Sequence, residues 1–379
     1  MISSGRGLGW VSVGLVAGYL IAGWWPFAFR PTNQVSWLPN RAGLQFQPDG
    51  IAFDPETLPL PGSFGNSNQL AGFTIELWVE AAAQPVTGVY HLVTLHDGRL
   101  PSNFVLCQWK QEILIRAVTS AATGPRRARE VGVDNALVAR RPRFITVSGD
   151  SSGTEFHLDG VLAEGFPDLV LNSQTLSGRL IFGNAANGKQ SWAGRFYGAA
   201  IYNRKLEASE VARHHSIWTN SQAGQLATVP GLAALYLFSE GSGGLSLDHS
   251  TNRHRLIIPS VYRVPQKEWL VPPWSWSADL QRDIVDLVLN IIGFVPFGFC
   301  FYRHCQLSCR CSWQCGALVV VTSGAVVSLT IEVIQVWLPN RVSSLSDLIC
   351  NTAGTLLGVV LAVVVYRTLL ARDAATAPD

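Results

Sequence analysis

Hydrophobic positions follow two different patterns along the chain. Four long and nearly uncharged apolar runs occupy residues 7–29, 284–302, 316–338 and 348–370, whereas the region between the first two runs contains only short apolar segments. The hydrocarbon core of a bilayer is about 30 Å thick and needs about 20 helical residues to cross it. The four runs are therefore predicted to be transmembrane helices.

The first run follows Arg6, as a secretory signal would, but it ends in the bulky sequence WWPF instead of a small-residue cleavage site. We interpret it as a retained anchor. Tryptophans next to the first two runs are expected to form interfacial aromatic belts, namely Trp24, Trp25, Trp269, Trp274 and Trp276.

The intervening region, residues 40–260, has the pattern of a β domain. Its short alternating segments are bounded by Gly, Asn, Asp and Pro and show no useful helical period. The clearest are FTIELWVE (73–80), FVLCQWK (104–110), RFITVSG (143–149) and RFYGAAIYN (195–203). Many short strands at this spacing predict a sandwich or jelly roll.

Composition agrees with a membrane protein that carries a soluble domain. The 379 residues are 48% hydrophobic and 14% charged, and the net charge of +2 gives no reason to expect a nucleic-acid partner. We divide the chain into six parts. They are a first helix (1–29), a linker (30–39), a β domain (40–260), an interfacial linker (261–283), helices two to four (284–371) and a tail (372–379).

Basic residues in the short connections predict the orientation. If the four runs alternate across the membrane, one side collects the basic residues of the short segments, which are Arg6, Arg303, Arg310, Arg367 and Arg372. That side is the cytoplasm by the positive-inside rule. Both termini are therefore expected in the cytoplasm, and residues 30–283 outside it, which in a bacterium is the periplasm.

Polar residues interrupt the last three apolar runs or lie beside them: Asp286, Asn290, Glu332, Gln335, Arg341, Asp347 and Asn351. An ionisable group at membrane depth costs roughly 2.5–3.5 kcal/mol on insertion scales, which implies a partner, a wet cavity or a function. Each of the three runs places two of these residues on one helix face, at i,i+3 or i,i+4 spacing. All lie within about 10 Å of the outward end.

These residues can converge on one outward-facing polar pocket, with Arg341 above it as the cationic partner. The alternative is that buried hydrogen bonds and an Arg–carboxylate pair merely lock the helices together, although such bonds are worth only about 0.6–2 kcal/mol each. Both interpretations remain open at this stage. Gly354 and Gly358 continue the same stripe on the last run and allow helices to approach closely.

The three polar runs resemble a known family. DLVLNIIGFVPFGF (286–299), TIEVIQVWLPNR (330–341) and SLSDLICNTAGTLLG (344–358) carry, in order, the recurring elements of the VanZ-like family. WWPFAF at the end of the first run is similar to the opening helix of that family. The resemblance implies a link to envelope biology and, in the namesake, to low-level glycopeptide resistance. It implies no catalytic mechanism.

The β region resembles a second family. FTIELWV, EFHLDGVLAE, LIFGN and WAGRFYGAAIYNRKLEASEV are similar to successive strands of a LamG-like, concanavalin A-like jelly roll. LYLFSEGSGGLSLDHSTNRHRL (235–256) resembles the opening of such domains, yet here it closes one, as in a circular permutation. That arrangement would place the strands near residues 43–53 beside the exit strand. The expected fold is thus mixed: a four-helix transmembrane bundle plus an all-β jelly-roll sandwich.

The β domain offers candidate binding residues. Related folds include lectins, laminin-type modules and glucanases, and the fold alone does not choose among them. Trp109, Trp192 and Tyr197 are candidates for a glycan or partner surface, with packing in the core as the alternative. Retaining glycosidases need two carboxyl groups about 5–5.5 Å apart. The segment FTIELWVE offers Glu76 and Glu80, but Trp78 stands between them where a glucanase would have an acid, so we assign no catalytic residue.

Three further groups of residues have alternative interpretations. Arg126, Arg127, Arg129, Arg140, Arg141 and Arg143 could meet anionic polysaccharide or lipid headgroups, or be solvated loop residues. Asp159 and Asp248 could serve a calcium site, although turn chemistry is their primary explanation; no other cofactor is expected. Cys300, Cys305, Cys309, Cys311 and Cys315, with His304, lack the spacing of zinc knuckles.

Three functions follow from these observations. The leading hypothesis is a non-catalytic protein of the bacterial inner (cytoplasmic) membrane, which contacts membrane lipid and whose periplasmic jelly roll binds an envelope glycan or a protein. A second is an accessory or structural subunit that stabilises a larger membrane protein complex. A third is an enzyme acting on a lipid-linked envelope substrate at the outward pocket, with Glu332 as its acid or base.

Overall fold

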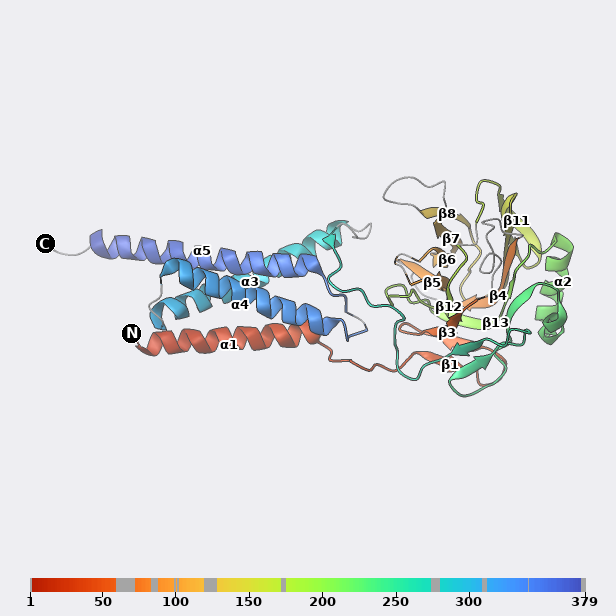
Figure 1. The fold of residues 1–379 in the computed structure, drawn as a ribbon, viewed down its shortest axis with the longest axis horizontal. Coiled ribbons are helices and arrows are strands. Elements are labelled where there is room, and N and C mark those ends of the chain that lie inside the picture. The colour runs from red at the N-terminus through yellow and green to blue at the C-terminus, as the bar shows by residue number, and fades with distance from the viewer. Residues whose placement is uncertain are drawn as a thin grey trace. The chain divides into compact units, whose positions relative to one another are not determined.

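The computed structural model forms two compact units, Pro31–Gln266 and the combination of Met1–Arg30 with Lys267–Asp379. We refer to them as the β unit and the helical unit; their elements are labelled in Figure 1. The structure describes residues 2–58, 72–82, 88–98, 100, 102–118, 128–171, 175–273, 280–308, 312–339 and 341–375.

Two antiparallel sheets make up the β unit. The first contains, in spatial order, β1 (Val35–Trp37), β2 (Leu44–Phe46), β13 (Gly194–Tyr202), β4 (Phe73–Ala81), β9 (Pro142–Asp150), β10 (Gly153–Leu158) and β11 (Val161–Phe166), with β14 (Leu232–Tyr236) also paired to β13. The second contains β15 (Leu245–Leu247), β16 (Arg255–Ile257), β3 (Ala52–Thr57), β12 (Arg179–Phe182), β5 (Val89–His96), β6 (Phe104–Trp109), β7 (Glu112–Val118) and β8 (Ala128–Val133). The predicted sandwich is confirmed.

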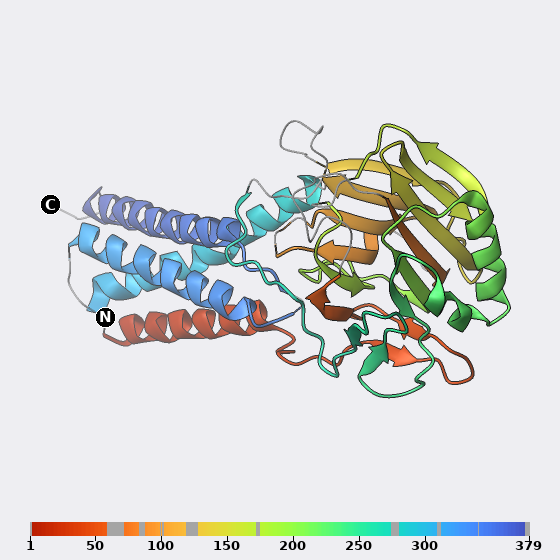
Figure 2. The same cartoon turned by 45° about the vertical axis from the view of Figure 1, so that its right-hand side comes forward.

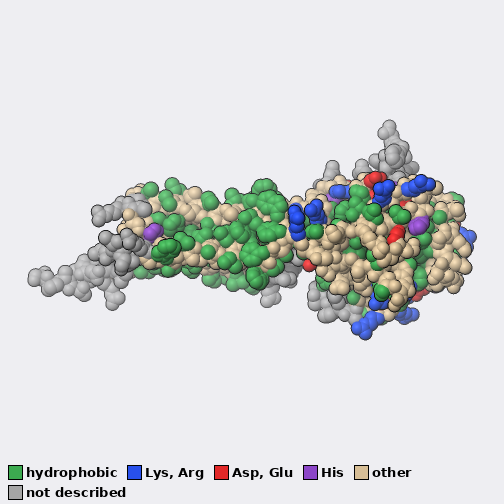
Figure 3. Space-filling model, turned by 90° about the horizontal axis from the view of Figure 1, so that it is seen from below, with side chains coloured by type: hydrophobic (Ala, Val, Ile, Leu, Met, Phe, Trp, Pro, Cys, Tyr) green, Lys and Arg blue, Asp and Glu red, His purple; other side chains and the backbone are tan. Residues whose placement is uncertain are grey.

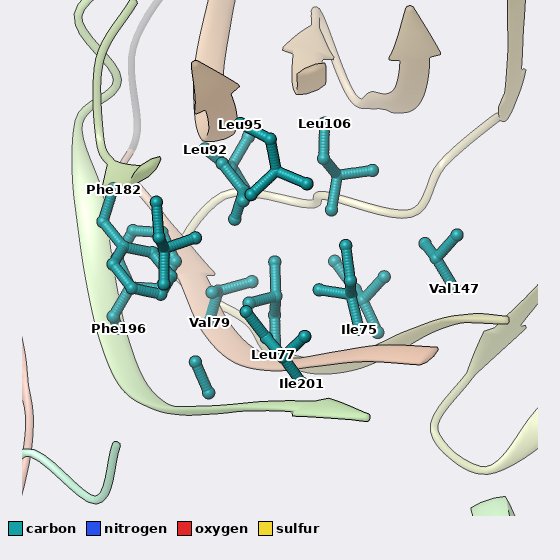
Figure 4. Packing of buried hydrophobic residues seen from close by; sticks show 14 of the residues in the cluster. Ile75, Leu77, Val79, Leu92, Leu95, Leu106, Val147, Phe182, Phe196 and Ile201 are labelled. Carbon is teal, nitrogen blue, oxygen red and sulfur yellow. The ribbon is translucent and has the colours of Figure 1, made fainter. Parts of the chain in front are cut away.

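The core lies between the two sheets. Strand β4 shows why, because Ile75, Leu77 and Val79 are buried in the apolar cluster while the residues between them point to the other face. Side chains from β5 and β12 of the second sheet meet them from across the sandwich, and those of β13 pack beside them from the neighbouring strand (Figure 4). The alternation that the sequence shows in residues 73–80 is therefore the signature of a strand with one face in this core.

Helix α2 (Ala208–Thr219) and the short 3-10 helix η1 (Ala223–Thr228) cover the outer face of the first sheet, as Figure 2 shows for α2. Trp218 of α2 and Leu226 of η1 pack there in a second apolar cluster with Tyr202 of β13. A capping box between Glu207 and Glu210 begins α2 by satisfying backbone N–H groups of its first turn. The outer face of this sheet is consequently covered as well, which lets β4 carry large side chains on both faces.

The closing segment of the β unit returns to its opening segment. Ile257 of β16 is paired with Phe53 of β3, and Thr32 forms an isolated bridge with Val261. The backbone N–H of Tyr262 donates to the carbonyl of Pro31 at 2.8 Å. The strand near residue 53 therefore lies beside the exit strand, as expected from the closing position of residues 235–256.

The helical unit contains α1 (Ile2–Trp24), α3 (Leu280–Ser308), α4 (Trp313–Gln335) and α5 (Leu345–Ala375). All four are long and apolar enough to cross a membrane. Their outer surface is largely hydrophobic on the face shown in Figure 3, as lipid contact requires. The protein is therefore a membrane protein with four candidate spans.

Glycines bring α3 and α5 into backbone contact. A Cβ atom at Gly298 would lie 2.1 Å from the carbonyl oxygen of Thr355, and one at Gly354 would lie 2.1 Å from that of Ile291. Gly358 has the same relation to Val295, at 2.2 Å. Such close approach increases van der Waals contact between helices in lipid, where no hydrophobic effect drives them together.

Candidate functional site

The predicted polar residues of the helical unit gather at one end of the bundle, where α1 and α4 finish and α5 begins. Glu332 is 1% exposed, and its carboxylate accepts the backbone N–H of Ser344 at 2.6 Å. Ser344 immediately precedes α5. Glu332 on α4 thus satisfies an unpaired N–H group beside the N-terminus of α5.

Asp347 lies in the first turn of α5 and joins it to α3. Its carboxylate is hydrogen-bonded by the side chain of Asn290 and interacts electrostatically with Asp286 and Glu332. Four of the seven predicted residues are therefore neighbours. Within the described parts of the chain, no group of three or more His, Cys, Asp or Glu side chains is arranged to hold a metal ion.

Arg341 occupies a different place from the one expected. Its guanidinium donates to the carbonyl of Trp25 at 2.7 Å and lies 3.5 Å from that of Ala22, at the C-terminus of α1. No ion pair within 4.0 Å joins it to an acid of the described residues. The expectation of Arg341 above the carboxylates is corrected: the unpaired carbonyls and negative dipole end of α1 attract the cation instead.

Gln335 and Asn351 also contact neighbouring helices. The Gln335 amide donates to the Gly23 carbonyl at 3.0 Å. The Asn351 amide donates to Ser328 Oγ at 2.9 Å, while Asn351 Oδ1 is buried with no hydrogen-bond partner. These contacts favour the interpretation that much of this polar set holds helix ends and helix pairs together.

One important residue at this end of the bundle was missed by sequence reasoning. The Lys267 ammonium group contacts three carbonyl oxygens of the connection between α4 and α5, those of Leu338, Pro339 and Arg341, at 2.6–2.9 Å. Four residues later, Val271 hydrogen-bonds through its backbone to Ser343 and Leu345. The linker that precedes α3 is therefore fixed to the connection between α4 and α5. Its only signal in the sequence is a lysine two residues before Trp269, which was predicted to be interfacial.

Two of the three aromatic candidates in the β unit are not at the surface. Trp192 is 1% exposed in the core, where its indole N–H donates to Gln108 Oε1 at 2.6 Å. Tyr197 is 4% exposed beneath the guanidinium of Arg41, which lies 3.7 Å from its ring centroid. The expectation that these rings face a ligand is corrected, because both fill space in the sandwich or under a covering side chain.

Trp109 is 42% exposed at the end of β6 and is the one aromatic candidate of the three that reaches solvent. The Lys110 ammonium lies 4.4 Å from its ring centroid. A cation already placed over an exposed ring is a favourable contact. It also covers part of the face on which a sugar would stack.

Glu76, the strand acid considered for catalysis, is fully buried beneath α2. It accepts from His214 Nδ1 at 2.8 Å, Trp218 Nε1 at 3.2 Å and the Tyr202 hydroxyl at 3.3 Å. Glu80 in turn accepts from Arg195 and Tyr197. Both carboxylates are used to hold the sheet and its covering helix, and Glu76 has no path to a substrate in this structure.

A cleft of about 780 Å³ opens beside residues 247–255 of the β unit. It is lined by Ala227, Leu247, Asp248, His249, Ser250, Thr251, Arg253, His254 and Arg255. Leu247 is 50% exposed, and His249, Thr251, Arg253 and Arg255 are also exposed. Sequence reasoning treated this segment as a closing strand and considered its Asp248 for calcium, but it did not predict a cleft, although the RHR sequence was a signal of a basic surface.

Asp248 fixes the conformation of this loop. Its carboxylate accepts backbone N–H groups of Leu235, Ser250 and His254 at 2.7–3.1 Å and the Ser250 hydroxyl at 2.6 Å. Asp159 is likewise engaged, with Arg143 at 2.5 Å and the Phe144 N–H at 3.0 Å. Both acids serve turn and loop structure, so the calcium alternative receives no support from their surroundings.

The arginines considered for anion binding have different environments. Arg129 contacts Asp168, and Arg143 contacts Asp159, so both are matched by an acid. Arg140 and Arg141 are exposed. Arg126 and Arg127 lie outside the described residues, as do Trp274, Trp276, Arg310, Cys309 and Cys311. No disulfide joins the cysteines that the structure does describe.

Fold and site together define a membrane protein with a β sandwich inserted between its first and second spans. The family model for the concanavalin A-like lectin/glucanases superfamily matches residues 57–212, and the VanZ/LLP1 family model matches residues 229–366. Both resemblances seen in the sequence are confirmed. The chain thus combines a VanZ-like region with a concanavalin A-like domain, and the VanZ/LLP1 match begins within the β unit.

Solved structures with similarity to the chain include three from different sources. They are a candidate carbohydrate-binding protein from Bacteroides ovatus (14% identity, TM-score 0.42), the receptor binding domain of botulinum neurotoxin C/D mosaic serotype (13%, 0.36) and a heptameric SAP-like pentraxin from Limulus polyphemus (8%, 0.35). The matches cover 58%, 49% and 49% of this chain and 58%, 45% and 82% of those chains. The chain thus spans less than two thirds of the first two. No curated protein sequence matches it.

Proposed function

We propose that this protein is a non-catalytic glycan-binding protein of the bacterial inner (cytoplasmic) membrane, with the β unit on the periplasmic side. The observation that carries the proposal is the cleft beside residues 247–255. Its volume of about 780 Å³ falls within the roughly 300–1,000 Å³ of small-molecule sites. It lies in the β unit, whose residues 57–212 match the family model of a superfamily that includes lectins.

The lining of the cleft suits a sugar. A sugar ring has apolar C–H faces and a rim of hydroxyl groups. Half-exposed Leu247 offers an apolar contact, while Thr251 and His249 offer polar groups at the same cleft. Because Asp248 holds the loop through its backbone, little conformational entropy is lost when a ligand binds.

Binding is favoured over hydrolysis by the environment of the strand acids. Glu76 is fully buried and Glu80 is hydrogen-bonded to Arg195 and Tyr197. Hydrolysis of a glycosidic bond needs a carboxyl pair that reaches the scissile oxygen. The polar end of the helical unit is assigned a supporting role, because Lys267, Gln335 and Arg341 hold backbone carbonyls there.

The test is a binding measurement on the full-length protein in mild detergent. Immobilised protein is exposed to purified bacterial envelope polysaccharides and to plant-derived neutral and acidic oligosaccharides, and binding is followed by biolayer interferometry. We expect saturable binding to at least one glycan, competition by the same glycan in solution, and no released fragments in the bound fraction. Failure of every glycan to bind would overturn the proposal, and release of fragments would overturn its non-catalytic part.

A further inference from the structure

The geometry points to an acidic glycan as the ligand of the cleft, held through a carboxylate or phosphate group by Arg253 and Arg255. This inference rests on the proposed function and adds the charge class of the ligand and the residues that select it. It starts from an imbalance of charge among the lining residues. The cleft carries Arg253, Arg255 and His249 at its exposed surface, and Asp248 is its one acidic lining residue.

Asp248 does not neutralise the arginines. Its oxygens accept backbone N–H groups and a hydroxyl, and it is 7% exposed. The buried His254 instead lies 3.0 Å from Asp54 and 3.9 Å from Glu56, the former contact lacking hydrogen-bond geometry. Asp54 and Glu56 thus face His254, and Glu240 accepts the backbone N–H of Leu247 at 2.7 Å, so none of these acids pairs with Arg253 or Arg255.

Arg253 and Arg255 keep their donors available. In the described part of the molecule, neither guanidinium forms an ion pair within 4.0 Å, in contrast to Arg116, Arg143, Arg195 and Arg204 of the same unit. A planar guanidinium matches carboxylate and phosphate oxygens bidentately. Two of them at one cleft also raise the local concentration of an anionic ligand.

The backbone supports the same assignment. Arg253 has a φ of 55°, in the left-handed region that a side chain with a Cβ rarely adopts. The loop keeps this conformation because Asp248 binds the N–H of His254 and Asn252 binds the carbonyl of Ala233 at 2.8 Å. An arginine at this position, where glycine would be unstrained, places its guanidinium at the cleft.

The experiment compares an acidic and a neutral oligosaccharide on the full-length protein. The probes are a galacturonic acid oligomer and a galactose oligomer of equal length, with inorganic phosphate as competitor. The test variant is Arg253→Ala with Arg255→Ala. The matched control is Arg140→Ala with Arg141→Ala, since both arginines are exposed and Arg140 has a similar φ of 59°.

We expect the wild type to prefer the acidic oligomer, and the Arg253/Arg255 variant to bind it about tenfold or more weakly while the control variant keeps its affinity. Glu56→Gln removes the negative charge that lies 3.9 Å from cleft-lining His254. It is therefore expected to strengthen binding of the acidic oligomer, a gain that misfolding cannot produce. Equal binding of both oligomers, or loss of affinity in the Arg140/Arg141 variant instead, would overturn the inference while leaving glycan binding intact. Binding of neither oligomer, when envelope glycans do bind, would overturn it as well.

Discussion

Single buried residues decide how the β unit responds to acid. His91 on β5 is 9% exposed, and its Nδ1 lies 3.0 Å from Thr94 Oγ1, whose hydroxyl donates to the Asn184 carbonyl. Because that hydroxyl hydrogen is used, His91 Nδ1–H is the donor in the pair. Burial, with a smaller contribution from the charge of Arg116, lowers the pKa of His91 from 6.5 to about 3.

This shift makes stability depend on pH. Between pH 6.5 and pH 3 the unfolded chain binds a proton at His91 that the folded chain does not. The free energy of unfolding is therefore undiminished by His91 above about pH 6.5, and it falls as the pH drops below that value. The loss between pH 7 and pH 5 is about 2 kcal/mol. We expect His91→Asn to abolish this part, measured as urea unfolding of the full-length protein in detergent at both pH values.

His157 provides a companion measurement. It is 1% exposed with neither ring nitrogen hydrogen-bonded, and burial lowers its pKa as well, so it contributes stability in the same direction. His157→Asn should flatten the pH dependence further when combined with His91→Asn. An unchanged difference between pH 7 and pH 5 in the double variant would contradict the assignment.

Helix elements in the membrane depend on glycine at particular positions. Gly298 and Gly293 both lie in α3, but a Cβ would meet the Thr355 carbonyl at 2.1 Å at the first position and nothing within 4 Å at the second. The two sites therefore share a helix and differ in whether a neighbouring backbone is in contact.

We expect Gly298→Ala to destabilise the helical unit by about 1–3 kcal/mol, because α3 and α5 must separate. Gly293→Ala should be neutral or slightly stabilising, because alanine favours the helix. Thermal unfolding of both variants in the same detergent measures the difference. Equal melting temperatures for the two variants would show that the close contact between α3 and α5 does not contribute to the stability of the helical unit.

At the scale of the whole molecule, orientation is the property to test. Arg6, Arg303 and Arg367 fall on one side of the membrane if the four spans alternate. Cys315, in the first turn of α4, is exposed. We expect a variant that retains only Cys107 and Cys315 to react at Cys315 with a membrane-impermeant maleimide in permeabilised spheroplasts but not in intact ones.

A Ser239→Cys variant on the β unit supplies the opposite outcome, because this exposed position should react in intact spheroplasts. Native Cys107 serves as an internal control: burial raises the pKa of its thiol to about 12, so it should remain unreactive while the protein is folded. Labelling of Cys315 in intact spheroplasts would show that the orientation is the opposite of the one proposed.

The sequence predicted those parts of the structure that depend on periodicity and length. Residues 73–80 alternate because one face of β4 meets the core, and the apolar run before Gln335 is long enough to cross a bilayer. Polar residues such as Glu332 and Asp347 were predicted to meet at one end of the bundle, and they do. Spacing along a helix fixes depth and face, which is sufficient for that result.

Partners were beyond the reach of the sequence. The contacts of Arg341 with α1, of Lys267 with the connection between α4 and α5, and of Glu76 with His214 each join residues more than 70 positions apart. Hydrophobic pattern alone did not distinguish buried Trp192 from exposed Trp109, because both are aromatic residues near strand ends.

The sequence by itself determined the spans, the sandwich and the two families, since each depends on local spacing of apolar side chains or on ordered motifs. Only the tertiary structure decided which polar groups are already hydrogen-bonded and which remain available. That distinction depends on contacts between distant segments, and it separates Arg143, matched by Asp159, from Arg253, whose guanidinium lines an open cleft.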